Sequence, residues 1–255
     1  MAVVAISGCS TGIGAATRAR LEAAGDTVLG IDLRDVEVPA DLSTVAGRQH
    51  AIEAVLEQSG GRLDRLVLCA GLGGHLEDTA SVAAVNYFGV VDLLDGLLPA
   101  LQNGQDPAAV VICSNSAQLA PDTGSSPLVA AMLDGDVEAV ARLAEHDFSG
   151  QQVYMMSKNA VGQAVRRRTL AWGEAGVRLN AVAPGPIMTP LLEGALETPD
   201  GAAIRAFKIP IGRMGEPSEV AGTIAYLLGP ETGFVHGAIW YIDGGADAFV
   251  RPERF

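Results

Sequence analysis

Tyr154 and Lys158 are the residues whose types and spacing point most directly to chemistry. They stand four positions apart in the run Tyr154-Met155-Met156-Ser157-Lys158, which places both side chains on one face of a helix. Because an ammonium group favours a nearby phenolate, we expect Lys158 to lower the pKa of Tyr154 below its usual value of about 10. Such a tyrosine can donate or accept a proton. The spacing alone is more often that of an ordinary helix surface, so its meaning depends on the surrounding elements.

A glycine-rich loop lies between an apolar strand at residues 2–7 and a helical run that ends near Gly25. Its glycines have the spacing GxxxGxG: Gly8, Gly12 and Gly14. Glycines permit a tight turn and a close approach of the backbone to a pyrophosphate, whose charge is attracted to a helix N-terminus. The loop therefore predicts a dinucleotide site, although any tight turn from a strand to a helix can also use glycines.

Asp32 indicates which dinucleotide the loop would take. It follows a second predicted strand, residues 27–31, and lies about 20 residues past the loop, where an acid accepts hydrogen bonds from an adenosine ribose. Because its carboxylate also repels a 2′-phosphate, we expect NAD(H) rather than NADP(H). Arg34 is an opposing signal, since an arginine can accommodate that phosphate, but a solvated loop charge is the simpler interpretation.

Small or polar residues follow the later strands, at the edge where open α/β sheets bind their ligands. The predicted strands are residues 64–69, 108–113, 177–182 and 238–242. Ala70 and Gly71 follow the first and are small enough for a cofactor to lie across the sheet. Ser114 places a hydroxyl at the end of the second. A Pro-Gly-Pro-Ile-Met-Thr run, residues 184–189, follows the third.

Three polar residues in the first half of the chain have two interpretations each. Asp41, beside Leu42, either caps the next helix or contacts an adenine, and the cap is the safer assignment. His75, in a glycine-rich loop, is more typical of a surface histidine than of a substrate contact. Asn86 lies in a long amphipathic helix, residues 81–101, either as an ordinary polar position or as a polar group near the site.

Two segments depart from the alternation of strands and helices. Residues 115–150 form an insertion, with a helical pattern over 128–148 that Gly135 can break. Residues 190–210 form a long connector with several apolar side chains, as in binding loops and lids. Together with Met155 and Met188 near the tyrosine, these side chains favour a bulky apolar substrate, although they are equally compatible with core or interface packing.

The composition limits the classes of function. The chain has 255 residues, 49% of them hydrophobic and 5% aromatic, which fits one α/β domain with buried parallel strands. Its net charge of −13 argues against nucleic-acid and anionic-membrane partners. No apolar run approaches the roughly 20 residues that span a bilayer. With no signal peptide and no metal spacing among Cys9, Cys69 and Cys113, we expect reduced thiols, no metal site and a cytoplasmic location.

Over almost its whole length the chain resembles the short-chain dehydrogenase/reductases. The matching motifs follow the family's order: Gly8-x3-Gly12-x-Gly14, Asp32, Asn86, Ser114, Tyr154-x3-Lys158 and Pro184-Gly185-x3-Thr189. The opening ISGCSTGIGAAT, the runs LVLCAGLG and AWGEAGVRLN, and the insertion before Tyr154 are similar to the bacterial 3α-hydroxysteroid dehydrogenase/carbonyl reductases. Ser7 and Cys69 depart from the Thr and Asn usual in the family, which loosens the expected hydrogen bonds of the loop.

The resemblance implies a single domain over residues 1–255, with a Rossmann-type, doubly wound α/β fold. Its mostly parallel sheet of about seven strands would have helices on both faces. Tyr154 would be the general acid or base, Lys158 would lower its pKa and bind the nicotinamide ribose, Ser114 would hold the substrate oxygen, and Asn86 would support a water-linked proton relay to Lys158. The implied NAD (NADH) contacts are Gly8, Ser10, Thr11, Gly12, Ile13, Gly14, Asp32, Leu33, Asp41, Leu42, Ala70, Gly71, Tyr154, Lys158, Pro184, Gly185, Ile187 and Thr189.

The implied activity is NAD(H)-dependent interconversion of a secondary alcohol and a ketone, with 3α-hydroxysteroids and 3-oxosteroids as substrates and a wider carbonyl reductase activity. A small non-steroid alcohol or a sugar is the alternative substrate class. A protein that senses a dinucleotide without turnover is the second alternative, and the presence of the serine, tyrosine and lysine argues against it. Because the insertion can cover the long helices through which family members associate, we expect a homodimer rather than a tetramer.

Overall fold

The computed structural model describes residues 1–119, 123–199 and 201–254, and it contains one parallel sheet. Its strands are β1 Val3–Ser7, β2 Thr27–Asp32, β3 Val38–Pro39, β4 Arg65–Leu68, β5 Ala108–Ile112, β6 Arg178–Pro184 and β7 Ile239–Ile242. The strand order is β3-β2-β1-β4-β5-β6-β7, and every pairing is parallel. The doubly wound fold is thus confirmed. Six strands were expected from the sequence within a residue or two at each end, whereas the two-residue β3 is too short to show a pattern.

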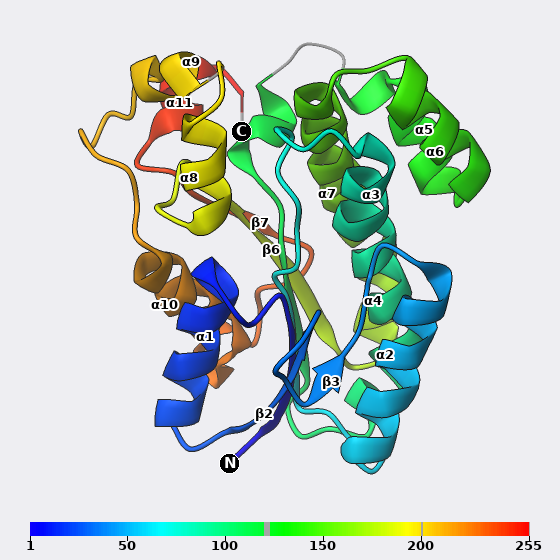
Figure 1. The fold of residues 1–255 in the computed structure, drawn as a ribbon. Helices are drawn as coiled ribbons and strands as arrows, with labels where there is room; N and C mark the ends of the chain where they lie inside the picture. The colour runs from blue at the N-terminus through cyan, green and yellow to red at the C-terminus, as the bar shows by residue number, and fades with distance from the viewer. Residues whose placement is uncertain (120–122, 200, 255) are drawn as a thin grey trace.

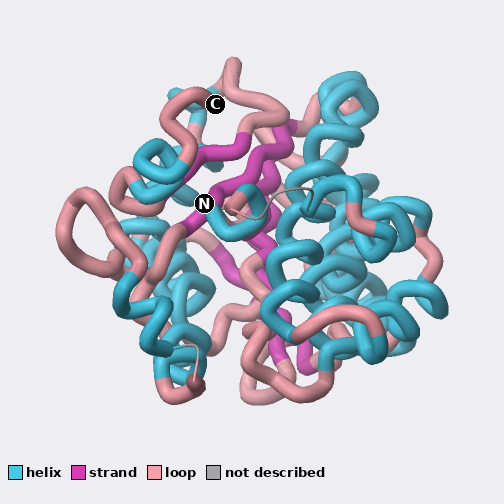
Figure 2. Tube along the Cα trace, turned by 90° about the horizontal axis from the view of Figure 1, so that it is seen from above, coloured by secondary structure: helices cyan, strands magenta, loops and turns pink. Residues whose placement is uncertain are grey.

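Helices cover both faces of the sheet (Figures 1 and 2). They are α1 Gly12–Ala23, α2 Val45–Gln58, α3 Thr79–Ala83, α4 Gly89–Gln102, α5 Pro127–Asp134, α6 Val137–His146, α7 Gly150–Glu174, α8 Pro190–Leu196, α9 Gly201–Ala206, α10 Pro217–Leu228 and α11 Ala246–Val250. In Figure 1, α1 and α10 pack together on one face, while α2, α4 and α7 lie on the other. The carboxyl ends of the strands point toward the top of Figure 1, where α8 and α9 lie.

Alternation along the strands divides the hydrophobic core in two. In β1, Val4 and Ile6 belong to a cluster with Val220 and Ile224 of α10, while Ala5 belongs to the larger cluster on the side of α2, α4 and α7. All five of these side chains are buried. Successive strand residues point to opposite faces, so a strand with helices on both sides is apolar throughout. This explains why the strands appeared in the sequence as continuous apolar runs.

The long helix predicted over residues 81–101 is longer and less regular than expected. Helices α3 and α4 are joined through a π-helical turn, Ala84–Phe88, to give one helical run over Thr79–Gln102. With a mean hydropathy of 1.4, this run is long and apolar enough for a membrane span, which corrects the expectation that no such run exists. Within the fold 67% of its apolar window is buried, because it is the central helix of the larger core.

The insertion before Tyr154 is helical and packs on the main domain. Two short 3-10 turns, Asn115–Gln118 and Thr123–Ser125, precede α5 and α6, and residues 120–122 lie outside the described chain. The break predicted at Gly135 is confirmed, since this glycine ends α5 with a φ of 74°. Helix α5 packs on α7 and α6 packs on α3, where Thr79 Oγ1 donates to the Ala144 carbonyl at 2.8 Å. The insertion therefore covers the outer side of the helices that hold the site.

We expect Leu97→Ala in α4 to lower the free energy of unfolding by about 2–5 kcal/mol, because it removes a fully buried side chain and leaves a cavity. The matched control is Leu33→Ala, which removes the same atoms from a side chain that is 68% exposed. Urea denaturation of the protein without ligands should show a change below about 0.5 kcal/mol for this control. Equal losses for the two variants would contradict the assignment of Leu97 to the core.

Candidate active site

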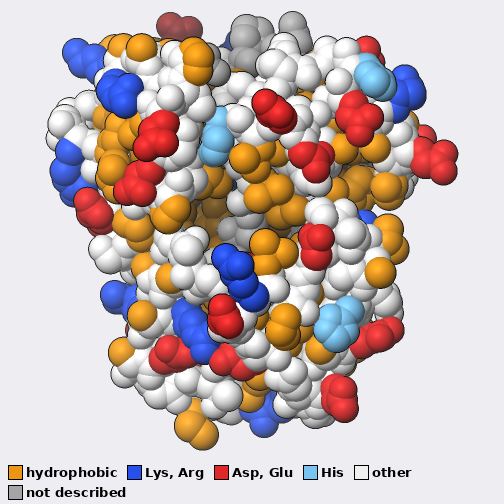
Figure 3. Space-filling model, in the orientation of Figure 1, with side chains coloured by type: hydrophobic (Ala, Val, Ile, Leu, Met, Phe, Trp, Pro, Cys, Tyr) orange, Lys and Arg blue, Asp and Glu red, His pale blue; other side chains and the backbone are white. Residues whose placement is uncertain are grey.

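A cavity of about 690 Å³ lies at the carboxyl ends of the central strands. Figure 3 shows the hollow near the middle of one face, with hydrophobic side chains around it. Residues from the glycine loop, from the ends of β2, β4, β5 and β6, and from α7, α8 and α9 line it. In a doubly wound sheet this edge is where ligands bind, because the connections on either side of the switch in strand order leave a crevice there.

The glycine loop has almost no room for side chains. Gly8 and Gly12 have φ values of 68° and 55°, which favour glycine. A Cβ on Gly8 would lie 2.5 Å from the Ala70 nitrogen, and one on Gly14 would overlap the Gly8 carbonyl oxygen. Thr11, the N-cap residue of α1, makes no side-chain cap. The loop thus presents bare backbone and uncapped helix amides to the cavity, as an anion site requires.

Asp32 lies beside this loop with its carboxylate oriented by two backbone amides. Oδ2 accepts from the Ser10 nitrogen at 3.0 Å, and Oδ1 accepts from the Leu33 nitrogen at 2.8 Å. Each oxygen keeps a further lone pair toward the cavity that Asp32 and Leu33 line. Arg34 is exposed and does not line the cavity, in agreement with its interpretation as a solvated charge.

The safer assignment for Asp41 is wrong. Helix α2 is capped by Thr44, whose Oγ1 accepts from the Gly47 nitrogen at 2.9 Å. Asp41 instead closes a local turn, with Oδ1 accepting from the nitrogen and the hydroxyl of Ser43 at 2.9 and 2.6 Å. Asp41 and Leu42 both line the cavity. Threonine and aspartate are both good caps, so the sequence alone could not select between positions three residues apart.

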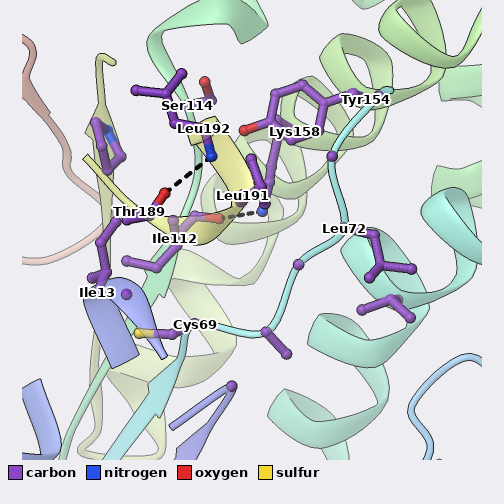
Figure 4. A pocket seen from close by; sticks show the side chains of 18 of the residues that line it. Ile13, Cys69, Leu72, Ile112, Ser114, Tyr154, Lys158, Thr189, Leu191 and Leu192 are labelled. Atoms are coloured by element: carbon purple, nitrogen blue, oxygen red, sulfur yellow. Dashed lines mark hydrogen bonds between the residues drawn. The ribbon is translucent and has the colours of Figure 1, made fainter. Parts of the chain in front are cut away.

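Ser114 and Tyr154 meet on the other side of the cavity (Figure 4). A hydrogen bond from the Ser114 side chain lowers the pKa of the Tyr154 phenol, but burial has the larger effect and raises this pKa above its ordinary value. Ser114 Oγ also lies 2.9 Å from Ser116 Oγ and accepts from the Ser116 nitrogen at 3.2 Å. The serine that follows β5 and the tyrosine of α7 thus line the same part of the cavity, and the raised pKa keeps the phenol protonated.

Lys158 does not lower the pKa of Tyr154 in this structure, which corrects the expectation from their spacing. Its Nζ donates to the Ile112 carbonyl oxygen at 3.1 Å, as Figure 4 shows, and burial lowers its own pKa. The shared helix face brings the lysine to the cavity, but a carbonyl at the end of β5 holds its ammonium. Helical spacing determines where the Cβ atoms of two residues lie, but it does not determine where the ammonium group of a long lysine side chain lies.

Asn86 lies in the π-helical turn, fully buried, and does not line the cavity. Its Oδ1 accepts from the Leu72 nitrogen at 2.8 Å, and its Nδ2 donates to the Leu72 carbonyl at 3.0 Å and to Ser157 Oγ at 3.2 Å. Asn86 therefore holds the loop after β4 to the helix that bears Tyr154. The interpretation as an ordinary polar helix position is wrong, and the π-turn, often found at functional sites, is its structural reason.

Thr189 links the end of the cavity at β6 to α8. Its Oγ1 donates to the Ile187 carbonyl at 3.2 Å and accepts from the Leu192 nitrogen at 3.3 Å, which caps α8 (Figure 4). A Cβ on Gly12 would lie 3.1 Å from Thr189 Cγ2, so the glycine loop and the threonine face each other closely. Gly185 has equally little room, since a Cβ there would lie 2.8 Å from Cβ of Asp243.

The wall formed by α8 and α9 is apolar. Its cavity-lining residues are Pro190, Leu191, Leu192, Ala195, Ala203, Ile204 and Phe207. The prediction of a connector with apolar contacts over residues 190–210 agrees with this wall, although residue 200 lies outside the described chain. Met155 and Met188, expected near the tyrosine, do not line the cavity. Both are neighbours of cavity-lining residues in the chain, Tyr154 for Met155, and Ile187 and Thr189 for Met188.

Most predicted site residues are brought together. Among the predicted catalytic and cofactor residues, all but Ser10 and Asn86 line the cavity. These two form hydrogen bonds to residues that line it, Ser10 to Asp32 and Asn86 to Leu72. Sequence reasoning missed Ser116, whose hydroxyl faces that of Ser114. The only signal was a serine three positions past the predicted end of a strand at residue 113. Cys69 also lines the cavity, where burial raises the pKa of its thiol to about 12.

The strand order and the position of the cavity define a doubly wound dinucleotide-binding fold. A family model described as short chain dehydrogenase matches residues 2–126, and one described as enoyl-(acyl carrier protein) reductase matches residues 127–247. The 3-alpha-hydroxysteroid dehydrogenase/carbonyl reductase of Comamonas testosteroni is 51% identical over 259 residues that cover 100% of both chains. This chain belongs to the short-chain dehydrogenase family.

Two solved structures show the range of similarity. The 3-alpha-hydroxysteroid dehydrogenase from Pseudomonas sp. B-0831, complexed with NADH, is 48% identical with a TM-score of 0.97, over 99% of this chain and 100% of that one. The ligand-free aldohexose dehydrogenase of Thermoplasma acidophilum is 25% identical with a TM-score of 0.76, over 96% and 93% of the two chains. Both share the fold, and they differ in the substrates that their names state.

We expect the phenol of Tyr154 to ionise above its usual value of about 10, because burial outweighs the hydrogen bond from Ser114. An ultraviolet titration of the free protein, with the curve of Tyr154→Phe subtracted, measures this ionisation. Ser114→Ala should raise the pKa further, since it removes the group that lowers it. An ionisation near neutral pH would instead show that Lys158 governs the phenol.

Proposed function

We propose that the protein is an NAD(H)-dependent oxidoreductase that interconverts a secondary alcohol and a ketone, with 3α-hydroxysteroids and 3-oxosteroids as its substrates and a wider carbonyl reductase activity. The observation that carries the proposal is the cavity itself, which is lined by the Ser114–Tyr154 pair, the glycine loop and an apolar wall. The relatives from Comamonas testosteroni and Pseudomonas, at 51% and 48% identity, support the steroid substrate through the activity in their names.

The residues around the glycine loop fit the cofactor. The uncapped first turn of α1 would bind the pyrophosphate, Asp32 would accept from the adenosine ribose, and Asp41 with Leu42 would contact the adenine. Lys158 would bind the nicotinamide ribose, and Ile187 with Thr189 would hold the carboxamide. When bound, the nicotinamide supplies or accepts the hydride.

The chain's own residues handle the substrate oxygen and its proton. Ser114, with Oγ oriented by Ser116, would donate a hydrogen bond to the carbonyl oxygen. Tyr154 would give its phenolic proton to that oxygen during reduction and accept it back during oxidation. A raised pKa keeps the phenol protonated before reduction, which suits a general acid. Asn86 would position this centre through Leu72 and Ser157, and its Oδ1 keeps a lone pair for a water in a relay to Lys158.

A sugar or another small alcohol is the alternative substrate class, supported by the similarity to the aldohexose dehydrogenase. A sugar needs a polar group of the protein for most of its hydroxyls, because buried hydroxyls left without partners cost affinity. The wall of α8 and α9 offers leucine, isoleucine, alanine and phenylalanine side chains. This lining favours the steroid.

The test measures NADH oxidation with 5α-androstane-3,17-dione and NAD reduction with a 3α-hydroxysteroid, in parallel with glucose and small polyols. Tyr154→Phe should lower kcat by about a hundredfold or more, because it removes the general acid, and should leave NADH binding intact by fluorescence. Activity on sugars alone would select the alternative substrate. A wild-type protein that binds NADH without turning over any substrate would indicate the dinucleotide sensor.

We propose a homodimer in the cytoplasm as the working form. The insertion covers α3 and α7, a face through which related chains associate, while Tyr226, Phe234 and Tyr241 leave large apolar side chains exposed near α10 and β7. Three free cysteines, Cys9, Cys69 and Cys113, are compatible with a reducing compartment.

Light scattering coupled to size exclusion should therefore give a mass of two 26.2 kDa subunits. Phe234→Asp places a charge on the fully exposed ring position and should shift the mass toward one subunit. Val137→Asp, a matched change at a 43% exposed position of the insertion, is the control and should leave the dimer intact. A mass near four subunits would overturn the proposal.

A further inference from the structure

His75 is a titratable side chain at the cavity to which the proposed chemistry gives no role. It follows Gly73 and Gly74 in the loop between β4 and α3, and it lines the cavity together with both glycines. The loop is held in two places. Asn86 binds both backbone groups of Leu72, and a Cβ on Gly74 would lie only 2.7 Å from Cα of Gln151 in α7. The loop that carries the imidazole is therefore held against the helix that bears Tyr154.

The ring lies between two glycines from different parts of the chain. A Cβ on Gly73 would lie 2.6 Å from Nδ1, and a Cβ on Gly194 of α8 would lie 3.0 Å from Nε2. A side chain at either position would displace the imidazole. The ring is the contact between the fixed loop and α8, a helix that has no buried residue of its own.

The two ring nitrogens have different surroundings. Nδ1 is buried and has no hydrogen-bond partner within the described chain. A proton on Nδ1 would be a buried donor without an acceptor, which is costly, so the neutral ring carries its proton on Nε2. Nε2 likewise has no protein partner among residues 1–119, 123–199 and 201–254, yet it is not sealed from solvent. His75 thus offers one unused N–H donor at the edge of the cavity.

We propose that His75 is a specificity-determining residue whose Nε2–H donates to a second, neutral oxygen of the substrate, remote from the carbonyl that Ser114 and Tyr154 hold. This inference rests on the proposed function and names the substrate class more closely, as bulky apolar ketones with a hydroxyl or ketone oxygen at the far end. In an apolar cavity a few placed polar groups fix the ligand's orientation. The wall beside His75, formed by α8 and α9, has leucine, isoleucine and phenylalanine side chains.

A matched pair of ketones isolates this contact. The ketone 5α-androstane-3,17-dione has the second oxygen, and 5α-androstan-3-one lacks it. His75→Phe keeps a flat ring between Gly73 and Gly194 but removes the N–H, and His75→Gln restores an N–H donor near Nε2. One hydrogen bond predicts that His75→Phe lowers kcat/KM for the dione by about 3- to 10-fold, mostly through KM, and changes that for the monoketone less than about 2-fold. The Gln variant should recover most of the loss.

Losses that are equal for the two ketones would show that His75 only seats α8, and no loss for either would show that its N–H is unused; both outcomes overturn the inference. Measurements of NADH binding and of thermal unfolding show whether either variant has a folding defect. If one does, the wild-type enzyme provides the test: its kcat/KM should be about 3- to 10-fold higher for the dione than for the monoketone, and equal values would overturn the inference. Failure of the proposed function looks different. A wild-type protein inactive on both ketones overturns that function and this inference with it.

Discussion

The site depends on the hydrogen bonds of the buried side-chain amide of Asn86. This fully buried group binds both backbone groups of Leu72 and the hydroxyl of Ser157, so it ties the loop after β4 to the helix of Tyr154 and Lys158. A buried amide in a helix interior is costly unless its hydrogen bonds are made, and here backbone and serine make them. These hydrogen bonds hold Leu72, which lines the cavity, at a set place beside the helix.

Burial, rather than charge, sets the state of the acid–base pair. It raises the pKa of Tyr154 and lowers that of Lys158, so both groups are biased toward their neutral forms. The Ile112 carbonyl, at the end of β5, binds the ammonium that simple spacing assigned to the phenol. Desolvation is thus the largest influence on the protonation of both groups, and Ser114 is the polar partner of the tyrosine.

The sequence predicted what backbone periodicity and local chemistry determine. Apolar runs located six strands, the glycine spacing located the loop, and Gly135 located the break in the insertion. The prediction failed where the result depends on which of several nearby residues makes a contact in the folded chain. Thr44 caps α2 in place of Asp41, Met155 and Met188 do not line the cavity, and β3 is two residues long. Ser116 had no signal of its own, since its role comes only from the turn that folds its hydroxyl back on Ser114.

The packing of α1 against α10 has a consequence for the order in which the molecule is assembled during synthesis. Helix α1 begins at the glycine loop, yet the partner that buries its apolar side is Pro217–Leu228, close to the other end of the chain. Strand β1, the first to leave the ribosome, likewise waits for β4 before both of its edges are paired. We therefore expect α1 to lack its packing partner until most of the chain has been synthesised, whereas β1 can pair on both edges once residue 68 is available.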